Sequence, residues 1–241
     1  MIILLFSTLA YVTFLGAFLY AVGFTGGLWV PKGIDDGALT STSNALMVNL
    51  LLLSAFAIQH SVMSRPAFKR WWTRIVHPAA ERSTYVLLTN ALLALIYWQW
   101  RPLPESVWNL TGGVWDTVLT ALFWAGWGIV FVSSFLIDHF ELFGLKQGVF
   151  HARGVPMPKS VFRETVFYTW VRHPIMLGFI IAFWSAPVMS QGHLLFAGVT
   201  TAYILVAIRL EERDLAAALG SEYRAYQKRT SMLLPIPKRK R

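Results

Sequence analysis

The sequence predicts an all-α protein: a polytopic bundle of transmembrane helices with five to six membrane segments, a C-terminal helical hairpin and a cytoplasmic amphipathic tail helix. Hydrophobic residues make up 56% of the 241 residues, and the mean hydropathy is +0.52. Charged residues make up 14%, against about 25% in average globular chains. Apolar runs long enough to cross a bilayer recur along the chain, so we expect a single integral membrane domain over 1–241.

Four apolar segments in 1–137 are predicted to cross the membrane, because a crossing helix needs roughly 17 to 25 apolar residues. The first segment lacks the basic start and the small-residue cleavage site of a signal peptide, so we interpret it as a retained anchor. The four segments are 1–24, 44–63, 84–100 and 114–137.

The next two apolar segments, 175–190 and 193–208, are at the short limit for a crossing and are separated only by Gln191 and Gly192. So short a connection predicts a tight helical hairpin, which either crosses the membrane or stops short of it. The predicted boundaries are 138–173 for a cytoplasmic loop, 174–210 for the hairpin and 211–241 for a basic cytoplasmic tail.

The distribution of positive charge predicts the orientation. Of the 21 Lys and Arg residues, 19 fall in 64–83, in 138–173, or from Arg209 onward. The alternate loops hold only Lys32 and Arg101. The positive-inside rule therefore places both termini in the cytoplasm, and we expect the bacterial inner membrane. The same rule and anionic lipid explain the net charge of +9 without a nucleic-acid partner.

Several classes of site are excluded. Without cysteine the chain has no disulfide, cysteine nucleophile or iron–sulfur cluster, so any thiol in its chemistry belongs to a substrate. No G-x-G-x-x-G or Walker A motif is present, and the histidines lack metal-ligand spacing, so we predict no metal.

Polar groups concentrate where the hairpin begins and ends. Pro174 is tolerated in the first turn of a helix, whose N–H groups, with Arg172 and His173, would hold an anion. The alternative is a basic anchor followed by a proline cap. At the other end, Glu211 and Glu212 would bind an ammonium group, or alternatively form salt bridges on a continuing helix. The hairpin predicts that the two clusters are close in space.

Two further groups complete the candidates. Leu215, Leu219, Tyr223 and Tyr226 have helical spacing, so the tyrosines either belong to an interfacial belt or wall a pocket. Titratable groups at the predicted cytoplasmic helix ends mark functional sites in membrane proteins, although a lone histidine is more often hydrogen-bonded core. These groups are His60, Tyr85, Asp138 and His139.

The ordered pattern R-H-P, R-x-E-E and L-G-x-x-Y-x-x-Y, over roughly 164–235, resembles the membrane methyltransferases that include the isoprenylcysteine carboxyl and phosphatidylethanolamine methyltransferases. The stretches AIQHSVM (57–63), RPAFKRWW (65–72), ERSTYVL (81–87) and DHFELFGLKQ (138–147) resemble the nurim and NnrU branch, and within it the methanethiol S-methyltransferases.

This resemblance implies transfer of a methyl group from S-adenosylmethionine to methanethiol at the cytoplasmic side, giving dimethyl sulfide. The partners would be a small thiol and the bilayer, with no obligate protein partner. By motif, the residues implied to bind the cofactor are Arg172, His173, Pro174, Leu177, Gly178, Arg209, Glu211, Glu212, Tyr223 and Tyr226.

The nucleophile would be a thiolate. An alkanethiol is less acidic than cysteine, whose pKa is about 8.5, so a base would assist its ionisation. His60, Asp138 or His139 is the candidate base, with Tyr85 and Arg82 as positioning residues.

Two alternatives remain open. One keeps the cofactor but uses another acceptor, namely a prenylcysteine, a lipid amine or another small thiol. The other is a non-enzymatic membrane protein of the nurim or NnrU kind. Loss of cofactor binding on replacing Glu211 and Glu212 with alanine separates both enzymes from the non-enzymatic protein.

Overall fold

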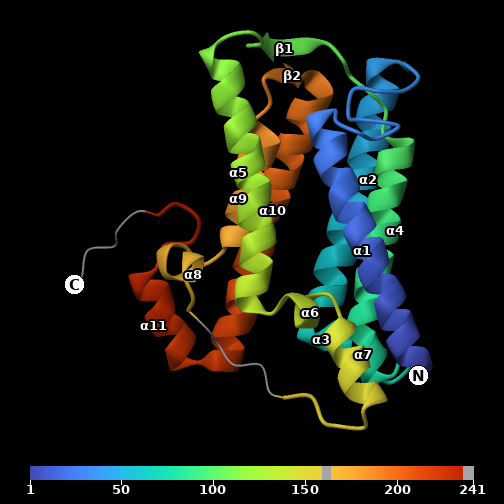
Figure 1. The fold of residues 1–241 in the computed structure, drawn as a ribbon, viewed down its shortest axis with the longest axis vertical. Helices are drawn as coiled ribbons and strands as arrows, with labels where there is room; N and C mark the ends of the chain where they lie inside the picture. Colours follow the sequence, from blue (N-terminus) through green and yellow to red (C-terminus); the bar gives the residue numbers. More distant parts are fainter. Residues whose placement is uncertain (159–163, 236–241) are drawn as a thin grey trace. The chain divides into compact units, whose positions relative to one another are not determined.

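A computed structural model describes residues 1–158 and 164–235, and this part of the chain is mostly helical (Figure 1). The predicted cytoplasmic cations Lys159, Arg163, Lys238, Arg239, Lys240 and Arg241 lie outside the described residues. In chain order the elements are α1 (Ile2–Gly26), α2 (Thr42–Ser64), α3 (Pro66–Trp72), α4 (Pro78–Gln99), β1 (Ser106–Asn109), α5 (Val114–Ile137), α6 (His139–Leu142), α7 (Leu145–Ala152), α8 (Phe167–Trp170), α9 (Pro174–Trp184), β2 (Val188–Ser190), α10 (Gln191–Leu219) and α11 (Ser221–Arg229).

Helices α1, α2, α5 and α10 are long and apolar enough to cross a membrane. Large apolar side chains on them point away from the protein; Leu19, for example, is 67% exposed and Leu51 is 64% exposed. Exposure of this kind is stable in lipid and unfavourable in water. The predicted polytopic helical membrane protein is therefore confirmed. Helix α4, which contains all of the predicted segment 84–100 except Trp100, has 22 residues but is more polar.

The predicted tight turn at Gln191 and Gly192 is wrong. Helix α9 ends at Trp184, the chain reverses before β2, and both residues belong to the start of α10. Pro187 explains the early end, because a proline cannot continue a helix and disfavours helical geometry in the residue before it. With 11 residues, α9 is about 16 Å long, roughly half of a hydrocarbon core.

The predicted tail helix is also divided differently. Helix α10 continues to Leu219, well past the expected end of the hairpin at 210. Gly220 then adopts a positive φ of 61°, which glycine accepts readily, and α11 follows. Leu215 and Leu219 thus lie on a different helix from Tyr223 and Tyr226, and the single amphipathic face was an incorrect prediction. The described parts of the expected loop, 138–158 and 164–173, contain the short helices α6, α7 and α8.

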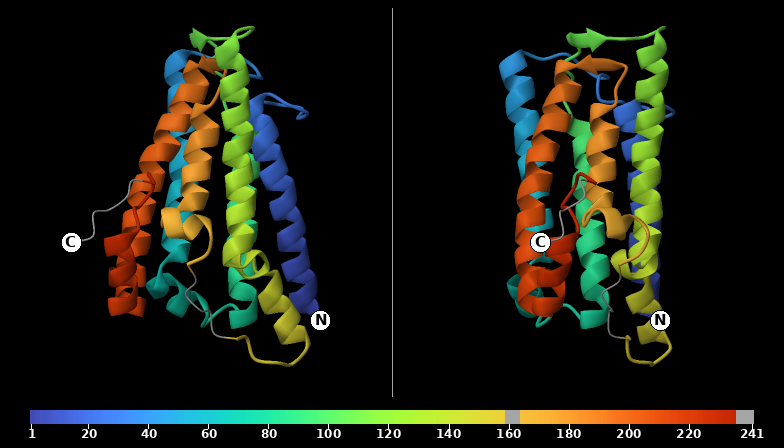
Figure 2. Two further views of the ribbon diagram at one scale, coloured as in Figure 1. Left: turned by 60° about the vertical axis from the view of Figure 1, so that its left-hand side comes forward. Right: turned by 90° about the vertical axis from the view of Figure 1, so that its left-hand side faces the viewer.

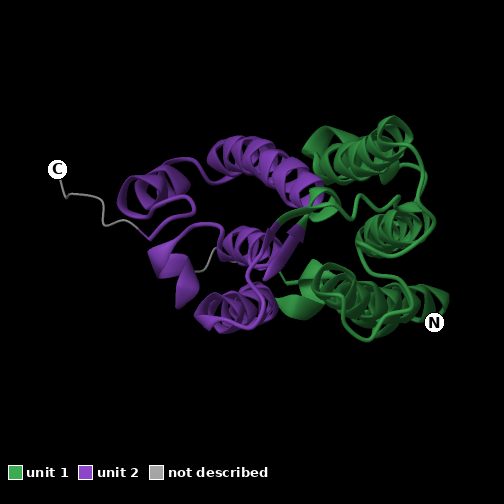
Figure 3. Cartoon of the chain, turned by 90° about the horizontal axis from the view of Figure 1, so that it is seen from above, with its two compact units in different colours: residues 1–107, 138–160, 190–193 green, residues 108–137, 161–189, 194–241 purple. Residues whose placement is uncertain are grey.

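The chain forms two compact units (Figure 3). Strands β1 and β2 pair, and the division between the units passes through both strands. Unit 1 comprises Met1–Val107, Asp138–Ser160 and Ser190–His193, and unit 2 comprises Trp108–Ile137, Val161–Met189 and Leu194–Arg241.

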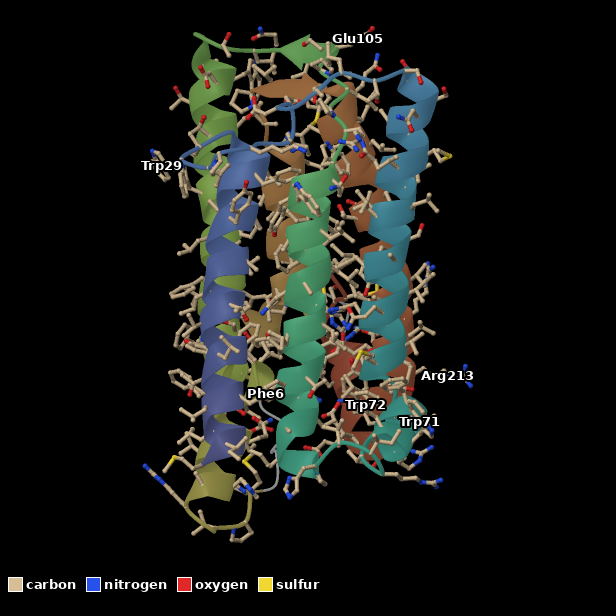
Figure 4. The ribbon with its side chains drawn as sticks, turned by 90° about the vertical axis from the view of Figure 1, so that its right-hand side faces the viewer. Phe6, Trp29, Trp71, Trp72, Glu105 and Arg213 are labelled. Carbon is tan, nitrogen blue, oxygen red and sulfur yellow. The ribbon has the colours of Figure 1, made fainter. Side chains whose placement is uncertain are left out.

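In unit 1, α1 packs against α4 and α7, and α2 packs against α4. Small polar residues let three of these helices approach closely. Ser83 donates to Ser7 at 2.8 Å, and a Cβ on Gly148 would lie 2.6 Å from the Ser7 hydroxyl. Trp71 and Trp72 lie on α3 at one end of this unit, and Trp29 lies near its other end (Figure 4).

Lys32 and Arg101, the two cations outside the predicted basic side, both lie at the end of α4 where the helix meets the loop after α1. The Lys32 ammonium donates to the carbonyls of Trp98 and Trp100, both at 2.8 Å. It thereby satisfies acceptors that the end of α4 leaves open. Asn49 exchanges two hydrogen bonds with the backbone of Arg101, at 2.7 and 2.9 Å. These contacts tie the end of α4 to α2 and to the loop after α1.

In unit 2, α5 packs against α9 at very short range. A Cβ on Gly126 would lie 2.6 Å from the backbone nitrogen of Ala182, and one on Gly178 would lie 2.7 Å from the carbonyl of Gly126. The Trp127 ring meets the edges of Phe179 and Phe183 beside this contact. Glycine is therefore required at both positions for the two helices to approach.

Candidate active site

One end of unit 2 is formed by α8, α11, the start of α9 and the end of α10, and Figure 2 shows these segments together. Helix α10 has 29 residues, whereas about 20 cross a bilayer core, so its end carrying Glu211 and Glu212 extends past the hydrocarbon. The R-H-P segment precedes α9 at this same end. The charged groups of the two predicted clusters therefore share one end of unit 2.

Glu212 is the centre of a hydrogen-bond network. Its Oε1 accepts from Arg172 Nε at 2.6 Å and from His173 Nε2 at 3.0 Å. Its Oε2 accepts from Gln227 Nε2 on α11 at 2.9 Å. The side chain of Glu212 is 13% exposed and that of Arg172 is 7% exposed. The structure thus brings together the R-H-P segment and the second acid of the R-x-E-E segment.

Glu211, although adjacent, has a different environment. Its carboxylate lies 3.7 Å from His173 Nδ1, beyond a normal hydrogen bond, and its side chain is 46% exposed. Of the two acids, Glu211 is the one whose carboxylate is open to a ligand.

The backbone of the R-H-P segment is held by the chain that follows α11. Val171 and Ser231 form a parallel bridge. The Arg172 N–H donates to the Ser231 carbonyl at 2.8 Å, and the His173 N–H donates to the Met232 carbonyl at 3.2 Å. The start of α9 is therefore fixed by residues almost sixty positions further along the sequence.

The Arg172 guanidinium also binds this segment. Its Nη1 donates to the carbonyl of Gln227 at 3.2 Å and to that of Thr230. Together with the bond to Glu212, these contacts give Arg172 three acceptors within the protein. Arg172 is therefore a buried residue whose hydrogen bonds hold the tail against the start of α9.

Tyr223 and Tyr226 on α11 are 1% and 2% exposed, so neither belongs to an interfacial belt. The Tyr226 hydroxyl donates to the carbonyl of Tyr168 on α8. Burial raises the pKa of Tyr226 to about 12 and also raises the pKa of Tyr223. Both phenols therefore stay protonated at neutral pH, and Tyr226 acts as a hydrogen-bond donor.

The other predicted cofactor residues take different positions. Pro174 is buried as the first residue of α9, and Leu177 is half-buried on that helix. Gly178 faces α5, so it serves helix packing. Arg209 is exposed on α10. Because the His173 side chain is bonded to Glu212, it does not cap the first turn of α9.

In unit 1, His60 on α2 meets Tyr85 on α4. The Tyr85 hydroxyl lies 2.9 Å from Nδ1 and 2.8 Å from Nε2 of His60, and Thr89 lies 3.5 Å from Nδ1. Phe56 stacks on the imidazole with 5.2 Å between the ring centres. The Arg82 guanidinium lies 5.1 Å above the Tyr85 ring. Three of the five predicted catalytic residues therefore form one cluster.

Asp138 and His139 lie elsewhere in unit 1 and have other partners. Asp138 accepts from the backbone N–H of Glu141 at 3.0 Å, which caps α6, and it pairs with Lys146. The resulting hydrogen bond raises the pKa of Lys146. His139 is 3% exposed, and its Nε2 lies 2.9 Å from the Tyr11 hydroxyl. Burial lowers the pKa of His139, so the ring is neutral.

Sequence reasoning missed Gln227, Thr230 and Tyr168. Gln227 lies one helical turn after Tyr223, and this spacing was the available indication that it shares the same face. Thr230 and Tyr168 act through backbone carbonyls, which leave no mark in side-chain identity. Among the described residues, no group of three or more His, Asp or Glu residues could hold a metal ion.

Known proteins are similar to this chain along nearly its whole length. The family described as NnrU protein matches residues 48–233. The methanethiol S-methyltransferase of Mycobacterium tuberculosis is 52% identical, over 98% of this chain and 97% of that protein. Methanethiol S-methyltransferase 2 of Bradyrhizobium diazoefficiens is 52% identical, over 97% and 90%. Nurim of Mus musculus is 31% identical, over 78% and 72%. No solved structure matches the chain.

Proposed function

The chain belongs to the NnrU family, and on that premise we propose that it transfers a methyl group from S-adenosylmethionine to methanethiol, giving dimethyl sulfide and S-adenosylhomocysteine. Support comes from the relatives that carry the name methanethiol S-methyltransferase, with about half of their residues identical across nearly the whole chain. The chain is a membrane transferase whose acceptor is a small molecule.

The cluster around Glu212, with Glu211 at its open side, is the observation that carries the cofactor proposal. S-adenosylmethionine presents an ammonium group, a carboxylate and ribose hydroxyls. The Glu211 carboxylate can accept hydrogen bonds from the ammonium group or the ribose hydroxyls of the ligand. The first-turn N–H groups of α9 can donate to the carboxylate of the ligand. The residues present therefore fit this donor, which supplies an electrophilic methyl group when bound. The residues that the resemblance implies for this site are Arg172, His173, Pro174, Leu177, Gly178, Arg209, Glu211, Glu212, Tyr223 and Tyr226; among them Gly178 packs against α5, and Glu211 is the one proposed to contact the donor directly.

For the proton of the thiol, we favour His60 over the other two candidates. Asp138 is engaged in capping α6 and in its pair with Lys146. His139 is 3% exposed among aromatic rings, whereas His60 is only half-buried. His60 is oriented by Tyr85, against which Arg82 packs. A neutral imidazole held in this way accepts a proton from a thiol, and such general-base assistance typically contributes roughly 10²- to 10⁴-fold.

We also propose the bacterial inner membrane, with both termini in the cytoplasm. Within unit 1, Lys32 and Arg101 lie at the C-terminal end of α4, whereas α3, which carries Lys69 and Arg70, precedes the N-terminal end of α4. This asymmetry supports the orientation expected from the positive-inside rule.

Calorimetric titration of S-adenosylmethionine into detergent-purified protein, with headspace detection of dimethyl sulfide after methanethiol is added, tests the function. Binding together with dimethyl sulfide production is the expected result. Binding without dimethyl sulfide production would indicate another acceptor. A folded protein that binds no donor would favour a non-enzymatic role.

A further inference from the structure

Glu212 receives its hydrogen bonds from three sources within the protein. Arg172 and His173 precede α9, and Gln227 lies on α11. A carboxylate offers about four acceptor sites. Three of them are occupied here, and the side chain is 13% exposed. Most of the binding capacity of Glu212 is therefore used inside the protein.

The two acids also differ in how far a neighbouring positive charge compensates their negative charge. The negative charge of Glu212 is neutralised by Arg172, with N and O atoms 2.6 Å apart. The Glu211 carboxylate lies 3.7 Å from the His173 ring, beyond a normal hydrogen bond. Glu211 therefore leaves a negative charge at the open side of the cluster, which suits a ligand with a positive charge or with hydroxyl groups.

The tail supplies much of what holds the cluster together. Gln227 bonds Glu212 through its side chain and Arg172 through its carbonyl. Thr230 accepts from Arg172 as well, and Tyr226 ties α11 to α8 through Tyr168. Removing the Gln227 side chain would take one hydrogen bond from Glu212 without altering any residue of a helix long and apolar enough to cross the membrane.

We propose that the two adjacent acids have separate tasks. Glu211 contacts the hydrogen-bond donors of the methyl donor, either its ammonium group or its ribose hydroxyls. Glu212 is a positioning residue that, together with Gln227 of the tail, holds Arg172 and His173 in place. This inference rests on the proposed function.

Calorimetry with S-adenosylhomocysteine and 5′-methylthioadenosine tests the role of Glu211. Glu211→Gln should weaken S-adenosylhomocysteine binding by about tenfold or more, because a charge-assisted hydrogen bond becomes a neutral one. Since 5′-methylthioadenosine lacks the amino-acid part, unchanged binding of that compound assigns Glu211 to the ammonium group. Weakening of both ligands assigns it to the ribose. Unchanged binding of both overturns the inference.

Steady-state kinetics test the positioning role. Gln227→Ala should raise the KM for S-adenosylmethionine several-fold and leave the KM for methanethiol unchanged. A purely structural defect would instead lower the amount of active enzyme, and hence the apparent kcat, without moving either KM. Lys228→Ala, at the adjacent exposed position of α11, is the matched control and should behave as wild type.

Two results would overturn the positioning role: an unchanged KM for the donor in Gln227→Ala, or a shift of the same size in Lys228→Ala. Wild-type protein that binds neither S-adenosylmethionine nor S-adenosylhomocysteine would refute the proposed function itself. Normal wild-type binding with unaffected variants would refute only the division of tasks.

Discussion

At the residue scale, the environment of a side chain separates candidates that the sequence treats as equivalent. Glu211 and Glu212 are neighbours in the chain, yet only Glu212 is enclosed by three donors. His60 and His139 both face a tyrosine hydroxyl, but His60 is half-buried and also contacts Thr89, whereas His139 is buried among aromatic rings. Burial and existing contacts therefore separate candidates that residue type alone does not.

Replacement of His60 should slow the methyl transfer. We expect His60→Ala to lower kcat for methanethiol by roughly 10²-fold or more, because the thiol must then ionise without an internal base. The deficit should shrink as the pH approaches the pKa of the thiol, where solvent supplies the thiolate. Headspace assays of dimethyl sulfide between pH 6.5 and 9.5, at saturating thiol, measure this, with His151→Ala as an exposed control. A deficit that does not change with pH would contradict a base role.

His139 should make stability depend on pH. Since burial lowers its pKa, the folded protein leaves the ring neutral at a pH where the unfolded chain, with a pKa of about 6.5, already binds a proton. The stabilisation is complete above that value and is lost as the pH falls below it. Melting temperatures from pH 7.5 to pH 5 should fall more steeply for wild type than for His139→Asn. His151→Asn, at an exposed position, should keep the wild-type slope.

At the scale of elements, the contact between α5 and α9 depends on glycine residues, which have no side chain to keep the two backbones apart. Gly126→Ala would place a Cβ 2.6 Å from the Ala182 nitrogen, so the two helices must move apart. We expect a loss of about 1 to 3 kcal/mol in stability, measured as a lower midpoint of thermal unfolding in detergent. Gly128→Ala, also on α5 but with nothing within 4 Å, should be neutral or stabilising. Equal effects of the two substitutions would refute the packing argument.

Hydropathy predicted the long helices well because lipid imposes a length on any segment that crosses it. The segment 114–137 coincides with α5, and 44–63 lies within α2. The interruptions at Pro187 and Gly220 were visible as residue types, but long apolar or polar runs around them concealed their effect. Conventional backbone rules applied at these two positions would have corrected both boundaries.

The candidate site was predictable only in part. R-H-P and R-x-E-E are marked by charged side chains in an apolar sequence, so their meeting was foreseeable once a hairpin was assumed. The docking of Ser231 and Met232 was not, because it uses backbone groups that every residue possesses. For the same reason the sequence did not distinguish Arg172 as a ligand of the cofactor from Arg172 as an anchor of the tail.

At the scale of the whole molecule, the asymmetry of charge makes a prediction about sidedness. A fluorescent protein fused after residue 241 should be fluorescent in a bacterial host, and alkaline phosphatase fused there should be inactive, since the tail is expected in the cytoplasm. Alkaline phosphatase inserted after Gly112, in the exposed turn before α5, should be active. The opposite pattern would reverse the proposed orientation.

The docking of residues 230–232 onto the start of α9 has a consequence for biosynthesis. A ribosome makes helices α1 to α10 before it makes Gln227 and Thr230, which bond to Arg172 and Glu212 in the folded protein. A nascent chain that stops after α10 would enter the membrane with this charged pair lacking its tail contacts. The hydrogen bonds around Arg172 and Glu212 are therefore complete only after residues 227–232 have been translated.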